Sequence, residues 1–275
     1  MSKGAQTKLI HSKSLSHPSS YVTDMYNKYS SWTFDEEDCL QFKGQWRTQV
    51  FNAPKNIKLD LEIGPGAGGF FSFIATQNKD RLFIAMELKY KPLIQTTRKI
   101  KESGCLNAKT IRYNARMLGD IFVPEELNNI YIHFPDPWPK KRHHKHRLIK
   151  PDFVKTLYQL QEKNSFIEIK TDHQEYFQEI HATFKNSPYK EIKFSNDLHN
   201  SQLPSQELIY RTGRESAPFG DSLPLGEKRD NQNTLASPLL SRGPDSQRSN
   251  QICITQFEKI FIRKNQAIHY LKCIK

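Results

Sequence analysis

The sequence lacks long apolar runs and paired cysteines, and these absences exclude several classes of protein. No stretch approaches the roughly 18 apolar residues of a transmembrane helix, and the first twenty residues are polar where a secretory signal would be apolar. Cys39, Cys105, Cys253 and Cys273 are widely spaced and form no Cys-x-x-Cys pair, which argues against a zinc site or a disulfide framework. We therefore expect a cytoplasmic protein with no membrane segment and no bound metal.

Hydrophobic residues are also scarce, at 36% of 275 residues, and the mean hydropathy is −0.71. Part of the chain is therefore expected to stay outside a packed core. Basic residues outnumber acidic ones, with 41 Lys and Arg against 29 Asp and Glu and a formal net charge of +12. This balance favours an anionic partner, and it bears on association rather than on the fold.

Composition and hydrophobic periodicity divide the chain into three parts. Residues 1–20 are rich in Ser, Lys and Gln, which predicts a flexible tail. Residues 21–195 together with 251–275 carry the strand and helix patterns of a folded domain. Residues 196–250 hold many Ser, Pro, Gly, Gln and Asn residues and few aromatics, so they bury little apolar surface to offset the entropy of ordering. We expect this segment to be a disordered, low-complexity insert.

Strand and helix patterns alternate within the folded part. Strands are expected at 57–63, 82–87, 109–113, 129–134, 165–169 and 190–194, and helices at 69–76, 89–101, from 151 onward and at 173–185. This βαβ succession predicts an α/β fold with a doubly wound, mostly parallel sheet that has helices on both faces. Two further strands, 254–262 and 267–274, are expected to form a C-terminal antiparallel hairpin with a turn near Asn265.

A glycine-rich turn lies between the first strand and the helix at 69–76. Gly64, Gly66, Gly68 and Gly69 let the backbone approach a ligand without Cβ clashes, and the helix N-terminus offers free N–H groups. Glu87 ends the second strand, where an acid can accept hydrogen bonds from both ribose hydroxyls of an adenosine. The glycines alone fit NAD, S-adenosylmethionine, or a turn that serves only close packing of helix and strand.

Two features favour S-adenosylmethionine. Glu62 lies two residues before the first glycine, where a carboxylate would repel a pyrophosphate but suits a cofactor that carries an ammonium and a sulfonium. Asp136 and Trp138 follow the fourth strand and are expected to face the cofactor crevice of such a sheet. We therefore favour methyl transfer over hydride transfer.

A proline-rich loop follows this fourth strand. Pro135, Pro137 and Pro139 cannot extend a strand or start a regular helix, and they stiffen the chain around Asp136 and Trp138. Cations follow with no acid among them: Lys140, Lys141, Arg142, Lys145 and Arg147. A carboxylate and a flat ring beside a cationic run indicate a site for a nucleobase attached to a phosphate backbone. The alternative is a proline-rich turn followed by a solvated basic run.

His143, His144 and His146 lie within the same run and are potential metal ligands. The flanking cations disfavour a divalent ion there. We therefore expect these histidines to extend the phosphate-binding surface and to gain charge as the pH falls.

Together these motifs resemble the bacterial tRNA (guanine-N7-)-methyltransferase family. The resemblance rests on residues 61–68, 134–143, 170–172 and 255–258, and extends over roughly 55–194 and 252–275. It implies a class I, Rossmann-like methyltransferase fold. It also implies transfer of a methyl group from S-adenosylmethionine to N7 of the variable-loop guanosine of tRNA, at position 46. The insert is longer than the connection that is usual in this family.

Combined with the motifs above, the resemblance assigns roles to individual residues. Glu62, Gly64, Gly66, Gly68, Glu87, Asn114 and Asp136 would contact the cofactor. Lys140, Asp172, Thr255, Gln256, Phe257 and Glu258 would hold the substrate, and Lys141, Arg142, Lys145 and Arg147 would contact tRNA phosphates. Two positions depart from the family: Asn114 stands where many relatives have Asp, and His146 replaces a frequent Arg.

The chemistry makes Asp136 the strongest candidate for a catalytic residue. Guanine N7 carries an in-plane lone pair and no proton, so the nucleophile needs no general base. The remaining tasks are alignment of N7 and balancing of the positive charge that moves onto the ring. Asp136 would either grip guanine donors or offset that charge, whereas Trp138 would stack on a base or only pack the loop.

Two segments also fit helix caps. Asp172 to Glu175 matches a capping box with Asp172 at the N-cap, a role that needs no substrate. Thr255 to Glu258 has similar spacing, but it introduces an alternating, strand-like segment, so capping is less natural there.

Two other functions remain alternatives to methyl transfer. The first is an NAD-dependent oxidoreductase, which Glu62 should exclude by repelling the pyrophosphate. The second is a non-catalytic RNA-binding module of the same fold. Such a module would bind tRNA without affinity for S-adenosylmethionine.

Overall fold

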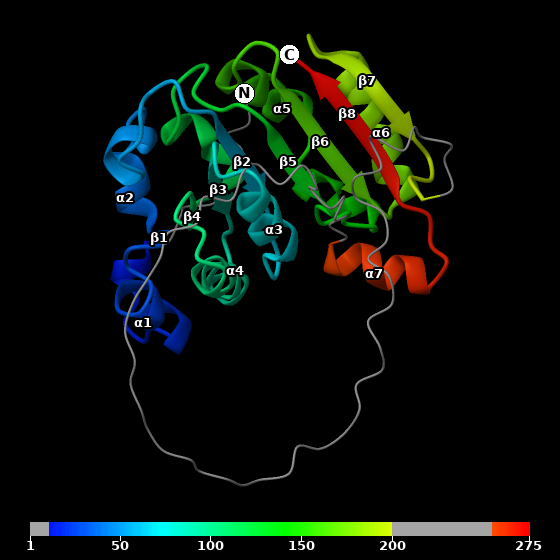
Figure 1. Cartoon of the computed structure of the whole chain (residues 1–275). Helices are drawn as coiled ribbons and strands as arrows, with labels where there is room; N and C mark the ends of the chain where they lie inside the picture. The colour runs from blue at the N-terminus through cyan, green and yellow to red at the C-terminus, as the bar shows by residue number, and fades with distance from the viewer. Residues whose placement is uncertain (1–10, 200–254) are drawn as a thin grey trace, which may run out of the picture. The chain divides into compact units, whose positions relative to one another are not determined.

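Eight strands form one sheet in the computed structural model, which describes residues 11–199 and 255–275. Their order is β1-β4-β3-β2-β5-β6-β8-β7 (Figure 1). The strands are β1 (Thr33–Phe34), β2 (Leu59–Ile63), β3 (Leu82–Met86), β4 (Ala108–Ile111), β5 (Ile130–His133), β6 (Phe166–Thr171), β7 (Lys190–Ser195) and β8 (His269–Ile274). β8 pairs antiparallel with both β6 and β7, and the other neighbours are parallel. The predicted α/β fold, with a mostly parallel sheet and an antiparallel pair at the C-terminal end, is confirmed.

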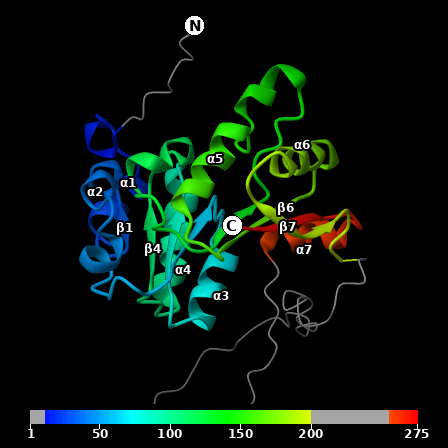
Figure 2. The same cartoon turned by 90° about the horizontal axis from the view of Figure 1, so that it is seen from above.

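Helices cover both faces of this sheet. α3 (Gly69–Gln77) and α4 (Tyr90–Glu102) pack together on one face, and α5 (Pro151–Leu160) and α6 (Gln174–Lys185) pack on the other (Figure 2). β2, β3 and β5 are buried along their whole length, as expected for central parallel strands that are covered on both sides. None of the described helices is long and apolar enough to cross a membrane.

The N-terminal segment packs on the domain instead of forming a long tail. Ser12, in the short helix η1 (Ser12–Ser14), is 2% exposed. Its backbone N–H and its hydroxyl both donate to the Glu36 carboxylate at 3.0 Å. The prediction of a flexible tail over residues 1–20 is therefore wrong from residue 11 onward, because a buried carboxylate distant in sequence supplies hydrogen-bond acceptors. The segment continues through α1 (Ser20–Tyr26), α2 (Glu36–Gln41) and η2 (Trp46–Val50).

The folded part also extends slightly beyond its expected boundary at residue 195. Leu198 is 7% exposed, and its N–H donates to the carbonyl of Ile268 at 2.7 Å. Residues 196–199 therefore belong to the packed domain. The rest of the disordered insert expected over 196–250 lies outside the described residues.

The strand expected over residues 254–262 is wrong, because α7 (Gln256–Arg263) occupies this position. A reciprocal capping box starts the helix: Glu258 N–H donates to Thr255 Oγ1 at 3.0 Å, and Thr255 N–H donates to Glu258 Oε2 at 2.8 Å. Phe257 and Phe261, four residues apart on one helix face, both contact the Phe134 ring. The capping box and this helical spacing outweigh the alternating hydrophobic pattern.

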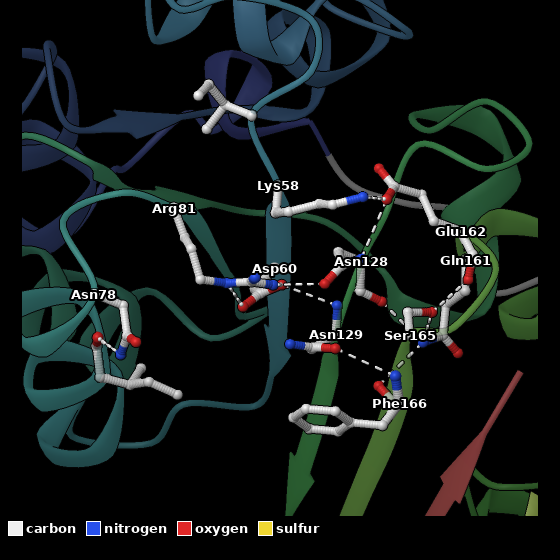
Figure 3. Close-up of polar contacts among 12 residues, drawn as sticks. Lys58, Asp60, Asn78, Arg81, Asn128, Asn129, Gln161, Glu162, Ser165 and Phe166 are labelled. Atoms are coloured by element: carbon white, nitrogen blue, oxygen red, sulfur yellow. Dashed lines mark hydrogen bonds and ion pairs between the residues drawn. The ribbon is translucent and has the colours of Figure 1, made fainter.

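A polar network joins the amino ends of the central strands (Figure 3). Arg81 Nε donates to Asp60 Oδ2 at 2.9 Å, and Asn129 N–H donates to Asp60 Oδ1 at 2.9 Å. Asn129 Oδ1 in turn accepts from Phe166 N–H at 3.2 Å. These bonds link the amino ends of β2, β5 and β6. They keep the three strands aligned, and so they also set where the carboxyl ends lie at the opposite edge of the sheet.

Candidate functional site

A cleft opens where β2 and β5 end. Its lining combines the turn after β2, the end of β5 and the start of α7: Glu62, Gly64, Pro65, Gly66, Ala67, Gly69, Phe70, His133, Phe134, Thr255 and Phe257. The strand order reverses between β2 and β5, and such a switch point at the carboxyl ends of parallel strands is the usual ligand site of an open α/β sheet. Residues that are far apart in sequence therefore meet at one candidate site.

The glycines of the turn after β2 divide into two roles. Gly64 and Gly66 have positive φ angles of 74° and 57°, and a Cβ added to Gly64 would meet no atom within 4 Å. Gly68 also has a positive φ of 73°, but its added Cβ would stand 2.7 Å from Thr96 Cα on α4. Gly68 therefore permits close packing of the turn on α4, whereas Gly64 and Gly66 border the cleft. The expected contact of Gly68 with the cofactor stays a prediction.

Glu62 supplies a buried acceptor to this cleft. Glu62 is only 3% exposed, and its Oε2 atom has no hydrogen-bond partner among the described residues. Burial raises the pKa of Glu62 to about 8, although the nearby charge of Lys170 opposes the rise. A buried carboxylate without a partner is costly. A cationic donor group in the cleft would offset this cost, so the site fits a cofactor that carries an ammonium group.

Glu87 lies at the turn between β3 and α4. Its Oε1 accepts hydrogen bonds from the N–H groups of Leu88 and Lys89, at 2.8 and 2.9 Å, which orient the carboxylate. Burial raises the pKa of Glu87, and the charge of Asp136 adds to the rise. The structure thus brings Glu87 and Asp136 within electrostatic range at the same edge of the sheet.

Asn114 precedes the short helix η3 (Ala115–Asp120), and its Oδ1 accepts from Arg116 N–H at 3.0 Å. This bond fixes the side chain at the end of β4. The amide is only half-buried, which is compatible with the expected contact to a ligand.

The loop after β5 displays Asp136 between two anchored aromatic residues. Phe134 and Trp138 have positive φ angles of 53° and 46°, a conformation that L-residues other than Asn and Asp seldom adopt. Phe134 packs against the rings of α7, and Trp138 packs on His146, with ring centroids 5.1 Å apart. Asp136 itself is exposed. Strained backbone around an exposed acid is typical of a functional loop.

The cationic run forms a short helix, η4 (Lys141–His146), and most of its basic side chains are exposed. Arg147 is the exception. The prediction that it contacts a tRNA phosphate is wrong, because its side chain is buried. Its side chain is 1% exposed, pairs with Glu179 at 2.6 Å, and donates through Nε to the Pro137 carbonyl at 2.7 Å. Arg147 therefore fastens the loop to α6, whereas Lys140, Lys141, Arg142 and Lys145 remain accessible.

The expected substrate residues are distributed unevenly around the cleft. Thr255 and Phe257 line it, and Phe257 is 50% exposed. Asp172 is half-buried and accepts a long hydrogen bond from Gln266, at 3.4 Å. The expected N-cap role of Asp172 is wrong, because His173 caps α6 by accepting from Tyr176 N–H.

Glu258 requires a further correction. It is 0% exposed, Oε2 accepts from Thr255 N–H, and Oε1 accepts from Lys170 Nζ at 3.1 Å. Its carboxylate is therefore committed to α7 and to β6. Glu258 can therefore affect a substrate only indirectly, by holding α7 in position.

Sequence reasoning did not single out the buried polar group beneath the cleft. Glu168 Oε1 lies 3.0 Å from His133 Nε2, and Glu168 Oε2 accepts from the Tyr270 hydroxyl at 3.1 Å. Burial lowers the pKa of His133, which favours the neutral ring. The available signal was the spacing of Glu168 and Lys170, because two charges at i and i+2 of an apolar strand share one face.

The fold and the cleft define a class I methyltransferase. Comparisons with known proteins agree: residues 56–216 match the family described as "Putative methyltransferase". A tRNA (guanine-N(7)-)-methyltransferase of Bdellovibrio bacteriovorus is 41% identical, over 66% of this chain and 87% of that protein. Proteins of the same name from Bacillus subtilis and Clostridium botulinum are 36% and 32% identical, over 59% and 61% of this chain and 75% and 78% of those proteins. The chain belongs to the tRNA (guanine-N7-)-methyltransferase family.

Proposed function

We propose that this protein transfers a methyl group from S-adenosylmethionine to N7 of the variable-loop guanosine of tRNA, at position 46, in the cytoplasm. The observation that carries the proposal is the pairing of two features at the carboxyl ends of β2 and β5. Glu62 presents a buried, unpartnered oxygen beside a glycine turn, and an exposed Asp136 precedes an accessible cationic helix. The names of the related proteins support the same activity.

Four residues from three strand ends would hold the cofactor. Glu62 would bind its amino group, and Gly64 would let the backbone approach it. Glu87 would accept hydrogen bonds from the ribose hydroxyls, and the Asn114 amide would face the adenine edge. S-adenosylmethionine supplies the methyl group as an electrophile on a sulfonium centre.

Asp136 is the catalytic residue of this proposal. Guanine N7 needs no deprotonation, so the carboxylate would grip guanine donors or offset the positive charge that develops on the ring. Its exposed position between the anchored Phe134 and Trp138 suits contact with a base that enters from solvent. Trp138 packs on His146, which favours a role in shaping the loop.

The remaining contacts would come from the rim of the cleft. Lys140, Asp172, Thr255 and Phe257, with Gln256 at the start of α7, would hold the guanosine. Exposed Lys141, Arg142 and Lys145 would contact phosphates without reading sequence.

A labelled-methyl assay on paired transcripts tests the proposal. One tRNA transcript carries guanosine at position 46, and the matched control carries adenosine there and is otherwise identical. We expect 7-methylguanosine, identified by mass, from the first transcript only. No methylated product, methylation of another atom, or equal product from both transcripts would overturn the proposal. Binding of NAD in place of S-adenosylmethionine would point to the oxidoreductase alternative.

A further inference from the structure

Two residues that line the cleft each bury a polar atom without a hydrogen-bond partner. Oε2 of Glu62 and Nδ1 of His133 have no partner within the ranges that the structure describes. The two residues are 3% and 7% exposed, and both line the cleft. An unpaired buried polar atom costs free energy. Two such atoms in one cleft therefore indicate a ligand that bonds to both.

Strand register places the two side chains on one face of the sheet. Glu62 on β2 pairs with Tyr131 on β5, and side chains alternate between faces along a strand, so His133 shares the face of Tyr131 and Glu62. The ring contacts agree, because Phe70 of α3 packs on both Tyr131 and His133, with centroids 5.3 and 4.6 Å apart. Glu62 and His133 therefore lie on neighbouring strands and face the same side.

The contact with Glu168 decides which ring nitrogen of His133 carries the proton. His133 Nε2 lies 3.0 Å from Glu168 Oε1, and Glu168 Oε2 accepts from the Tyr270 hydroxyl at 3.1 Å. Burial opposes ionisation of Glu168, but the hydrogen bond from His133 and the charge of Lys170 lower its pKa to about 2. An ionised carboxylate only accepts, so Nε2 is the donor. Because burial also keeps the ring neutral, Nδ1 presents a lone pair.

An ammonium group matches this pair of acceptors. It carries several N–H donors and no acceptor, so it can donate to Glu62 and His133 at the same time. Its charge also favours the ionised form of Glu62, because opposite charges stabilise each other. A carboxylate or phosphate group of a ligand would instead meet two acceptors and no donor.

We propose that His133 is a further cofactor-binding residue, whose Nδ1 accepts a hydrogen bond from the amino group of S-adenosylmethionine beside Glu62. Glu168 and Tyr270 are positioning residues, because they hold the ring in the tautomer that leaves this lone pair free. The inference rests on the function proposed above, since it concerns the same cofactor. It adds a requirement for the amino group of that cofactor.

Calorimetric titration with two ligands tests the contact without catalysis. The full-length protein is titrated with S-adenosylhomocysteine, the demethylated cofactor, and with its desamino analogue, in which hydrogen replaces the amino group. His133→Phe keeps a ring against Phe70 but removes the acceptor. We expect this variant to bind S-adenosylhomocysteine at least about 10-fold more weakly than the wild type does. Its affinity for the desamino analogue should stay within about 2-fold of the wild-type value, because no bond to an amino group is lost.

Two further variants accompany this test. His133→Asn is the conservative variant: the Asn amide oxygen lies as many bonds from Cβ as Nδ1 does, so it should keep most of the preference for S-adenosylhomocysteine. His269→Phe is the matched control. His269 is 5% exposed, its Nδ1 likewise has no partner in the described part of the chain, and it packs on Phe177 of α6, across the sheet from α3. This control should keep the wild-type preference.

Nitrogen NMR of the wild type gives a readout that does not require His133→Phe to fold. The Nδ1 resonance of His133 is identified by its absence from His133→Asn. It should shift when S-adenosylhomocysteine binds and stay in place when the desamino analogue binds. An equal shift with both ligands would overturn the contact.

The possible results separate the two proposals. A folded His133→Phe variant that keeps wild-type affinity for S-adenosylhomocysteine, or loses equal affinity for both ligands, would overturn the role of His133. So would a wild type that binds both ligands equally, even if it forms 7-methylguanosine. A wild type that shows the expected preference but forms no 7-methylguanosine would leave the role of His133 standing and overturn the proposed function.

Discussion

Thr96 on α4 lies so close to Gly68 that a Cβ atom on the glycine would stand 2.7 Å from the Thr96 Cα atom. Distances this short force the backbone to shift, and φ is also positive at Gly68. The neighbouring Gly64 has an equally positive φ, but its added Cβ would meet only open space. Gly68 is therefore needed for packing of the turn against α4, whereas Gly64 leaves open space that a ligand can occupy.

We predict that Gly68→Ala destabilises the protein more than Gly64→Ala. Both variants carry the cost of a left-handed alanine, about 1–2 kcal/mol, but only Gly68→Ala adds a clash with α4. Thermal unfolding without ligand compares the two. Gly64→Ala should show the larger loss of S-adenosylmethionine affinity relative to its loss of stability, and equal unfolding temperatures would contradict the assigned roles.

Because Glu62 is buried, we predict that its replacement by Gln stabilises the protein by an amount that increases with pH. Its pKa rises from the ordinary value of 4.5 to about 8 in the fold, so the folded state holds the proton more tightly. This contribution to stability is present below about pH 4.5 and is lost as the pH rises through about 8. Glu62→Gln cannot ionise, so its unfolding temperature without cofactor should exceed that of the wild type by roughly 2–4 °C or more at pH 8.5, with little difference at pH 4.5.

The same substitution should weaken cofactor binding. Glu62→Gln replaces a charged acceptor by a neutral one, and we expect S-adenosylmethionine affinity to fall at least about 10-fold at pH 8.5. Calorimetric titration measures the constant. Retention of wild-type affinity would show that Glu62 does not contact the cofactor.

Asp136→Asn should abolish most methyl transfer while preserving the fold. The side chain is exposed on its loop, so the change disturbs no packing, and loss of the charge should lower kcat by about 100-fold or more. Single-turnover kinetics with labelled S-adenosylmethionine provide the measurement. Unfolding temperature and tRNA affinity serve as controls, and a kcat near that of the wild type would refute the catalytic role.

Neutralisation of Lys141, Arg142 and Lys145 together should weaken tRNA binding and flatten its salt dependence. The slope of log K against log salt should fall by roughly 0.7–0.9 for each phosphate that the variant no longer neutralises. Arg147→Met provides the contrast within the same segment. Arg147 is buried and paired with Glu179, so its replacement should cost about 1.5–3 kcal/mol of stability without changing the contribution of the other three cations. An unchanged slope in the triple variant would mean that these cations face only solvent.

Local patterns in the sequence were sufficient to predict most of the sheet, and the turn and the loop that follow β2 and β5. The strands ending at Ile63 and His133, the glycine turn and the loop around Asp136 depend on hydrophobic alternation and on Gly and Pro conformations. These are properties of neighbouring residues. The family motifs then predicted which of these residues face a cofactor, and that assignment stays a prediction.

Other features were decided by partners that are remote along the chain. Arg147 looked like one more cation of a basic run until the fold placed Glu179 beside it. Glu258 looked like a substrate ligand, and α7 like a strand, until Lys170 and Phe134 supplied their contacts. Burial sets the ionisation of Glu62, and burial depends on the whole packed sheet. Hydrophobic pattern and turn chemistry determine which elements form, but the exposure and partner of a charged side chain follow only from the tertiary structure.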